Sequence, residues 1–356
     1  MKNIKGNKLF LPFKYCLMRK IFLAALVSVT LFASAQKIEV LTTGTKTSLR
    51  GLSVVNNNIL WVSGSNGMVG KSTNSGKTID WHTVKGYEQR DFRDIEAFDD
   101  KTAIIMAVAE PAIILKTKDG GYTWKKVFED TTKGMFLDCM DFTTDSKAGA
   151  VLGDPIDGNI FIAFTEDGGD TWKKDERHFP LQNGEALFAA SGTNLKITNI
   201  ANFYLGELVY VTGGKKSRLF FDDEANDIDM AQGTESQGAN SLDISQEDKK
   251  LIAVGGDFLH DTISTNNCII LTENEDEDII YSKPEIPPHG YRSCVAYILK
   301  NSWICCGTSG VDVSSDGGSN WKLISNESYN SCAKAKAGYE IYLAGKDGTV
   351  AKLVKE

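Results

Sequence analysis

Three arginines recur at corresponding places in this sequence: Arg50 in SLRGLS, Arg93 in DFRDIE and Arg292 in GYRSCV. Only six arginines follow residue 35, so half of them share one sequence context. A guanidinium group presents its N–H donors in a planar fork that matches a carboxylate or a phosphate. If the fold brings the three side chains together, they form an anion-binding site. The alternative is structural: each arginine pairs with an acid such as Asp94 or Asp138 and ties neighbouring sheets together.

A second set of side chains could accompany the arginines at the same site. These residues are Asp94, Glu110, Asp154, Glu185 and Tyr329. Sialidase-type glycoside hydrolases combine an arginine triad with a tyrosine nucleophile, an activating glutamate and an acid/base aspartate, so that activity is the alternative function. The Arg-Ile-Pro opening of sialidases is absent, however, because Gly51 and Leu52 follow Arg50. We therefore assign no catalytic residue and favour a non-enzymatic binding site.

The sequence contains no pattern typical of a metal or cofactor site. Its cysteines and histidines lack the spacing of a zinc site, and the acidic tracts at 222–229 and 273–278 do not match a calcium-binding EF-hand loop. A dinucleotide fingerprint between a strand and a helix is missing, as is a haem attachment motif. We expect no metal and no cofactor, and the tracts are interpreted as solvated turns.

The elements that must position these residues are indicated by an internal repeat. Four segments share the pattern [ST]-x-[DN]-x-G-x-[TN]-W: STNSGKTIDW, KTKDGGYTW, FTEDGGDTW and SSDGGSNW. Their key residues are Asn74 and Trp81, Asp119 and Trp124, Asp167 and Trp172, and Asp316 and Trp321. The tryptophans are 43, 48 and 149 residues apart, the last being three periods, and degenerate copies at 219–229 and 270–280 fill that gap. A period of about 40–50 residues is typical of four-stranded propeller blades.

The repeat has a structural chemistry. Its acidic or amide side chain can accept hydrogen bonds from the turn, its glycines supply positive φ, and its tryptophan can pack between sheets. This is the Asp-box of the bacterial neuraminidase (BNR) repeat. We predict an all-β, seven-bladed β-propeller with sialidase-like Asp-boxes, in which the first strands of the blades begin near Ser48, Asp91, Met135, Ala186, Asn240, Gly290 and Ser328. The strand at 37–43 should complete the last sheet and close the ring, which removes exposed sheet edges.

The first 35 residues have the features of a signal peptide. They contain six basic residues and no acid, then an apolar run from Ile21 to Phe32 and the small residues Ala33-Ser34-Ala35. We expect cleavage near Ala35, export to the periplasm or the medium, and a mature propeller domain at 36–356 without a membrane span. The formal charge of −8 then becomes about −14, because 33 basic residues remain against 47 acidic ones. Such a charge argues against nucleic-acid binding.

Six cysteines follow the predicted cleavage point. An oxidising compartment permits disulfides, but six cysteines are too few for a scaffold built on them. Cys294 and the pair Cys305-Cys306 flank a predicted hairpin, so a cross-strand disulfide is one alternative. We predict free buried thiols.

Together these features resemble a known family, the BNR-type propellers related to the photosystem II stability/assembly factor. The resemblance rests on the Asp-boxes, on the three arginine segments, and on GDPIDG and GEALFAASGT. It is strongest to exported bacterial members that are not photosynthetic. It implies a non-catalytic binding scaffold. Together with the predicted export, we expect a monomer that binds a protein or peptide in the cell envelope.

Overall fold

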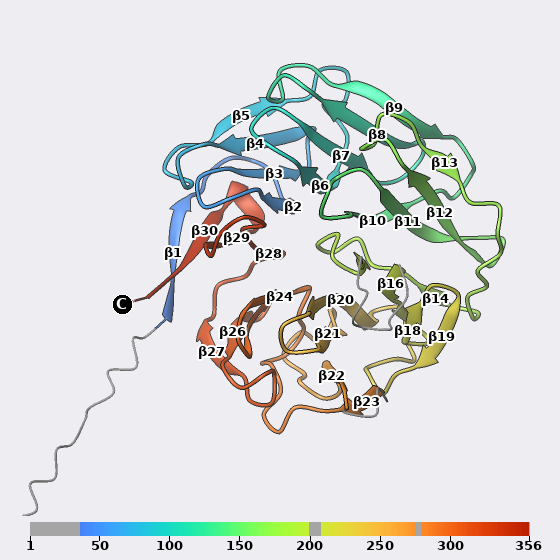
Figure 1. Cartoon of the computed structure of the whole chain (residues 1–356), viewed down its shortest axis with the longest axis vertical. Coiled ribbons are helices and arrows are strands. Elements are labelled where there is room, and N and C mark those ends of the chain that lie inside the picture. The colour runs from blue at the N-terminus through green and yellow to red at the C-terminus, as the bar shows by residue number, and fades with distance from the viewer. Residues whose placement is uncertain (1–35, 199–207, 275–278, 356) are drawn as a thin grey trace, which may run out of the picture. The chain divides into compact units, whose positions relative to one another are not determined.

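The computed structural model describes residues 36–198, 208–274 and 279–355. The chain divides into residues 1–34 and 35–356, and the fold below is that of the second unit. The predicted signal peptide lies outside the described residues. Seven antiparallel sheets are arranged in a ring, which confirms the predicted propeller (Figure 1). Among the described residues no helix is long and apolar enough to cross a membrane.

Each blade follows the chain from its first strand outwards. Blade 1 consists of β2 (Leu49–Val54), β3 (Leu60–Gly64), β4 (Met68–Ser72) and β5 (Asp80–Thr83). Blade 2 consists of β6 (Phe92–Ala97), β7 (Ala103–Ala107), β8 (Ala112–Thr117) and β9 (Lys125–Asp130). Blade 3 consists of β10 (Leu137–Phe142), β11 (Gly149–Ile156), β12 (Asn159–Thr165) and β13 (Lys173–Lys174). Contacts between neighbouring blades join their first strands, so these strands surround the central channel.

The remaining blades repeat this order. Blade 4 consists of β15 (Leu195–Ile197), β16 (Leu208–Val211), β18 (Arg218–Phe221) and β19 (Glu224–Asp227). Blade 5 consists of β20 (Gln237–Ser245), β21 (Lys250–Asp257), β22 (Cys268–Glu273) and β23 (Ile279–Ser282). Blade 6 consists of β24 (Cys294–Leu299), β25 (Ser302–Gly307), β26 (Gly310–Ser314) and β27 (Lys322–Ser325). The two degenerate copies of the repeat correspond to the β18–β19 and β22–β23 hairpins, although residues 275–278 lie outside the described residues.

The N-terminal strand closes the ring as predicted. Blade 7 contains β28 (Ser331–Lys334), β29 (Ile341–Ala344) and β30 (Val350–Lys355), with a short 3-10 turn, η1 (Lys346–Gly348), before β30. Strand β1 (Gln36–Thr42) pairs antiparallel with β30, with Gln36 opposite Lys355 and Thr42 opposite Val350. The outermost strand of the last blade therefore comes from the beginning of the domain.

The fourth first strand was predicted wrongly. It is β15, which begins at Leu195 rather than near Ala186. Residues 185–186 form β14 (Glu185–Ala186), which pairs with β17 (Gly213–Gly214) and thereby extends the sheet of blade 5 to six strands. Buried Leu187 and Ala189 give the segment an apolar pattern typical of a strand, but Gly192, with a φ of 73°, interrupts it.

Residues 188–194 instead cross the channel, and we call them the crossing segment. Ser191 Oγ donates to the carbonyl oxygen of Ser293 in blade 6 at 2.7 Å. The hydroxyls of Thr193 and Ser241, the latter in blade 5, lie 2.6 Å apart. A side chain at Gly192 would collide with the carboxylate of Asp94 in blade 2. The segment thus braces blades on opposite sides of the ring.

The Asp-box turns have the predicted chemistry. In the second copy, Asp119 Oδ1 accepts a hydrogen bond from the Thr123 amide at 2.9 Å, and Thr117 Oγ1 accepts one from the Gly121 amide at 3.0 Å. Equivalent bonds occur in the copies that begin at Ser72, Thr165 and Ser314. The tryptophans of the repeat join the apolar cores between neighbouring blades, as predicted.

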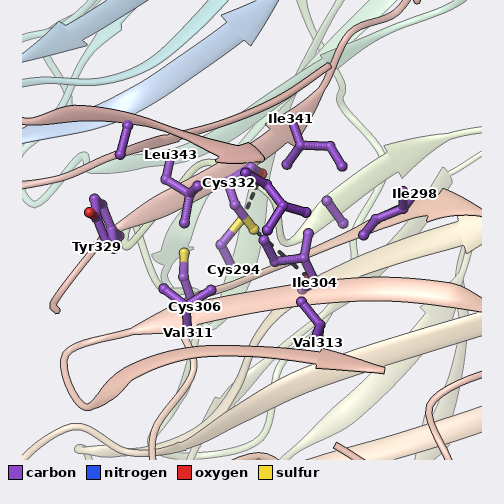
Figure 2. Close-up of a cluster of buried hydrophobic side chains, with 13 residues drawn as sticks. Cys294, Ile298, Ile304, Cys306, Val311, Val313, Tyr329, Cys332, Ile341 and Leu343 are labelled. Carbon is purple, nitrogen blue, oxygen red and sulfur yellow. Dashed lines mark hydrogen bonds between the residues drawn. The ribbon is translucent and has the colours of Figure 1, made fainter. Parts of the chain in front are cut away.

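The core between blades 6 and 7 contains three of the cysteines. Figure 2 shows Cys294, Cys306 and Cys332 pointing into this cluster from three strands. The Cys294 thiol donates to the Cys332 carbonyl oxygen at 3.2 Å. All six cysteines after residue 35 are free and buried, as predicted.

The Asp-box turn yields a first testable prediction. Gly169 has a φ of 84°, and a Cβ there would lie 2.2 Å from Cδ1 of buried Ile104. Gly86 has a φ of 85° but nothing within 4 Å. Gly169→Ala should therefore lower the free energy of unfolding by about 2–5 kcal/mol, combining backbone strain with overpacking. Gly86→Ala should show only the backbone part, about 1 kcal/mol. Equal losses in urea unfolding would contradict this account of the turn.

Candidate functional site

A cavity of about 390 Å³ opens where the first strands begin, on the side of the ring away from the Asp-box turns. We call it the mouth pocket. Its lining residues come from the crossing segment and from blades 1, 2, 5, 6 and 7: Arg50, Arg93, Phe188, Ala189, Ala190, Asn240, Phe258, Tyr291, Ser293, Thr308 and Asn330. The structure thus brings two of the three predicted arginines into one pocket.

A β-bulge positions both arginines. The strand register shifts between Leu49 and Gly51 in blade 1, so Arg50 is the extra residue of that bulge. The same shift between Phe92 and Asp94 makes Arg93 the extra residue in blade 2. A bulge re-aims a side chain relative to the regular pleat. The repeated bulge therefore turns both guanidinium groups towards the same pocket.

Arg292 does not occupy this position, which corrects the prediction that the three arginines are equivalent. Arg292 lies two residues before Cys294, which is the first paired residue of β24. Phe92 likewise lies two residues before Asp94 in blade 2, and it is buried. Arg292 therefore corresponds to Phe92 and not to Arg93. Ser293 occupies the pocket position instead. A shift of one residue moves a side chain to the other side of a strand. Arg292 is accordingly 0% exposed, and its Nε donates to Asp312 Oδ2 at 2.8 Å.

Arg50 is held by the crossing segment rather than by an acid. Its Nη1 donates to the carbonyl oxygen of Ala190 at 3.0 Å. Burial lowers the pKa of Arg50, and the positive charge of Arg93 lowers it further, while Asp91 opposes both effects. The two guanidinium groups are therefore close enough to repel each other, and an anion between them would relieve that repulsion.

Arg93 is partly neutralised within its own blade. Its Nε lies 2.8 Å from Asp91 Oδ2, and its guanidinium carbon lies 5.7 Å from the centre of the Phe136 ring. The buried carboxyl of Asp138 is also near Arg93, but burial and the charge of Asp154 raise the pKa of Asp138 well above its usual value. These three arginines therefore do not form the salt bridges between adjacent sheets that were the structural alternative.

Three aromatic rings line the pocket beside the arginines, and none of them was predicted as a site residue. Phe258 lies 6.2 Å from Phe188 and 6.3 Å from Tyr291 between ring centres, in edge-to-face geometry in both cases. The Tyr291 hydroxyl donates to Asn240 Oδ1 at 2.9 Å. Because Phe188 and Tyr291 lie outside the strands and Phe258 follows β21, strand periodicity could not reveal that they converge.

Three of the predicted acids stabilise loops or blade junctions. Asp94 is buried and accepts hydrogen bonds from the amides of Ile95, at 2.8 Å, and Met140, at 2.7 Å, and burial raises its pKa well above the usual value. Glu110 accepts a hydrogen bond from the Gly134 amide. Asp154 accepts one from the Leu187 amide at 3.2 Å. None of these three carboxylates lines the mouth pocket.

The remaining predicted residues are buried away from the pocket. Glu185 forms an ion pair with Arg218, whose Nε lies 2.9 Å from Oε1, and the Thr212 hydroxyl donates to the same carboxylate. Tyr329 is 1% exposed and packs in the core between blades 6 and 7. Arg292, Glu185 and Tyr329 therefore do not assemble with Arg50 and Arg93 into the arrangement that a sialidase requires.

The comparisons with known proteins agree with this fold. No protein-family model matches the chain, and no curated protein matches it. Solved structures do: one described as YCF48 bound to D1 peptide has a TM-score of 0.61 and 16% sequence identity, covering 90% of this chain and 97% of that chain. YCF48 from Cyanidioschyzon merolae has a TM-score of 0.61 and 15% identity, covering 89% and 98%. The resemblance to photosystem II assembly-factor propellers is thus confirmed at the level of fold.

The reassignment of Arg292 can be tested by stability. Arg292→Ala would leave Asp312, which is 0% exposed, without its guanidinium partner, so the free energy of unfolding should fall by about 3–5 kcal/mol. Arg50→Ala removes one hydrogen bond to a carbonyl group and should cost about 1.5 kcal/mol. Urea unfolding of both variants measures the difference. Equal losses would mean that Arg292 is not the more deeply structural arginine.

The partly buried carboxyl of Asp154 predicts a pH dependence of stability. Burial raises its pKa from 3.8 to about 6. Between these values the native state binds more protons than the unfolded state, so this group makes stability fall as pH rises. Asp154→Asn, which retains an acceptor for the Leu187 amide, should be more stable than wild type above pH 6, by about 2 kcal/mol, and equal to it near pH 4. Asp157→Asn, in the exposed turn nearby, is the matched control, and an unchanged pH slope in Asp154→Asn would refute the prediction.

Proposed function

We propose that this chain is an exported, non-enzymatic β-propeller scaffold that binds a protein or peptide partner in the cell envelope at its mouth pocket. One observation carries the proposal. The described residues that line the pocket include two arginines and no carboxylate, although acids outnumber bases in the whole chain by 47 to 39. A cationic pocket in an acidic protein selects for an anionic group, because the pocket focuses the field of its own charges.

The surroundings of the pocket favour a polypeptide ligand. Phe258 is 43% exposed and Leu259, the next residue, is 71% exposed. Exposed apolar side chains next to arginines are typical of the centre of protein interfaces, where aromatic residues and arginine are enriched. A protein surface or peptide can contact both kinds of group at once.

The fold supports the same proposal by analogy. YCF48, a propeller of similar fold, has been solved bound to D1 peptide. Fold alone does not fix function, so the proposal depends on the mouth pocket, and the analogy shows only that a propeller of this kind can hold a peptide. The export part of the proposal is supported by the basic and apolar pattern of residues 1–35.

The arginines provide the test. The double variant Arg50→Ala/Arg93→Ala should recover at least tenfold less of the partners that wild type captures from the cell envelope, because two charge-assisted contacts are lost. Arg177→Ala removes an exposed arginine that pairs with Asp175 away from the pocket, and this control should behave as wild type. Chemical cross-links of captured partners should fall on the blade surfaces around the mouth pocket.

Folding of the double variant is checked by its thermal unfolding midpoint. If the double variant is unstable, Arg50→Lys/Arg93→Lys keeps the charges while losing the planar fork, and it should still weaken capture. Identical partners and cross-links for wild type and the folded variants would reject the mouth pocket as the binding surface.

A further inference from the structure

The crossing segment limits how a ligand can enter the mouth pocket. Ala189 and Ala190 of the crossing segment are part of its lining. The segment cannot recede, because Gly192 already packs against the Asp94 carboxylate and Ser191 is hydrogen-bonded across the channel. A cavity of about 390 Å³ is at the small end of ligand sites. It therefore admits a chain end or the tip of a loop, and not a polypeptide threaded through the ring.

One part of the pocket is built for an anion. Arg50 uses Nη1 for the Ala190 carbonyl, and Arg93 uses Nε for Asp91. The other guanidinium nitrogens have no salt bridge to an acid among the described residues. Since the two positive charges repel each other, a carboxylate between them gains hydrogen bonds and removes repulsion.

Another part is built for an apolar ring. Phe188, Phe258 and Tyr291 already stand in edge-to-face contact, so their surface is formed before any ligand arrives. The hydrogen bond from Tyr291 to Asn240 fixes one of the three rings. A further aromatic side chain can continue this edge-to-face arrangement, which contributes beyond simple burial.

We infer that the mouth pocket recognises a carboxylate together with an adjoining aromatic or large apolar side chain, presented by a peptide end or loop tip. The arginines bind the carboxylate and the three aromatic rings bind its neighbour. This inference rests on the proposed function and adds the chemical class of the ligand. The carboxylate can come from an acidic side chain or from a chain terminus, and the experiment separates these two sources.

Short fluorescent peptides test the inference by fluorescence anisotropy. Three peptides have both ends blocked: aspartate followed by phenylalanine, asparagine followed by phenylalanine, and aspartate followed by serine. A fourth ends in phenylalanine with a free carboxylate, and its amidated form is the control. We expect at least tenfold tighter binding when carboxylate and ring occur together than when either is replaced. The tighter of the two carboxylate sources is the one that the pocket prefers.

Two variants test the aromatic part of the pocket. Phe258→Ala should abolish the preference for phenylalanine over serine, because it removes one of the three rings of the aromatic part. Leu259→Ala removes an exposed apolar side chain from the same loop that does not line the pocket, and it should keep the preference. Phe258 is 43% exposed and lies in a loop after β21, so its replacement should not impair folding.

The outcomes distinguish the inference from the function on which it rests. Equal affinity for the phenylalanine and serine peptides, or a preference that survives Phe258→Ala, would overturn the aromatic part while arginine-dependent capture of envelope partners could still hold. Failure of all the peptides to bind would overturn the inference as a whole. Only unchanged capture by the arginine double variant would overturn the proposed function itself.

Discussion

Closure of the ring is the constraint on which the rest of the structure depends. Strand β1 completes the sheet of the last blade by pairing with β30, so the beginning and end of the domain share one sheet. Closure sets the first strands of all seven blades around one channel, and the beginnings of these strands face the same opening. Residues 50, 93, 240 and 293 are far apart in sequence, yet they line one pocket for this reason.

Within the closed ring, register decides which side chains reach the pocket. Arg50 and Arg93 reach it because the same bulge recurs in blades 1 and 2. Arg292 looks equivalent in sequence, but it is one residue out of place and becomes a buried partner of Asp312. Because side chains alternate between the two faces of a strand, a shift of one residue moves a side chain to the opposite face. Sequence similarity of short segments could align the arginines, but it could not resolve a single residue of register.

The parts of the fold that repeat were predictable and the parts that do not repeat were not. The Asp-boxes, the number of blades and the closing strand follow from the period of the sequence and from turn chemistry. The crossing segment precedes the first strand of blade 4, β15, and its apolar residues form a pattern typical of a strand. Phe188, Phe258 and Tyr291 lie outside the periodic strands, and only the three-dimensional structure shows that they meet. The aromatic part of the pocket was therefore invisible to pattern analysis.

Burial also explains how a cationic pocket persists in an acidic protein. The carboxyl groups of Asp94 and Asp138 are near the arginines in sequence or in space, and ionised they would weaken the positive field. Both are buried, and burial raises the pKa of each well above its usual value, which favours the neutral form. Of the acids close to Arg93, Asp91 pairs with it directly, so two guanidinium groups face one paired carboxylate. The pocket keeps an excess of positive charge because Asp94 and Asp138, the other two acids near the arginines, are buried in the core.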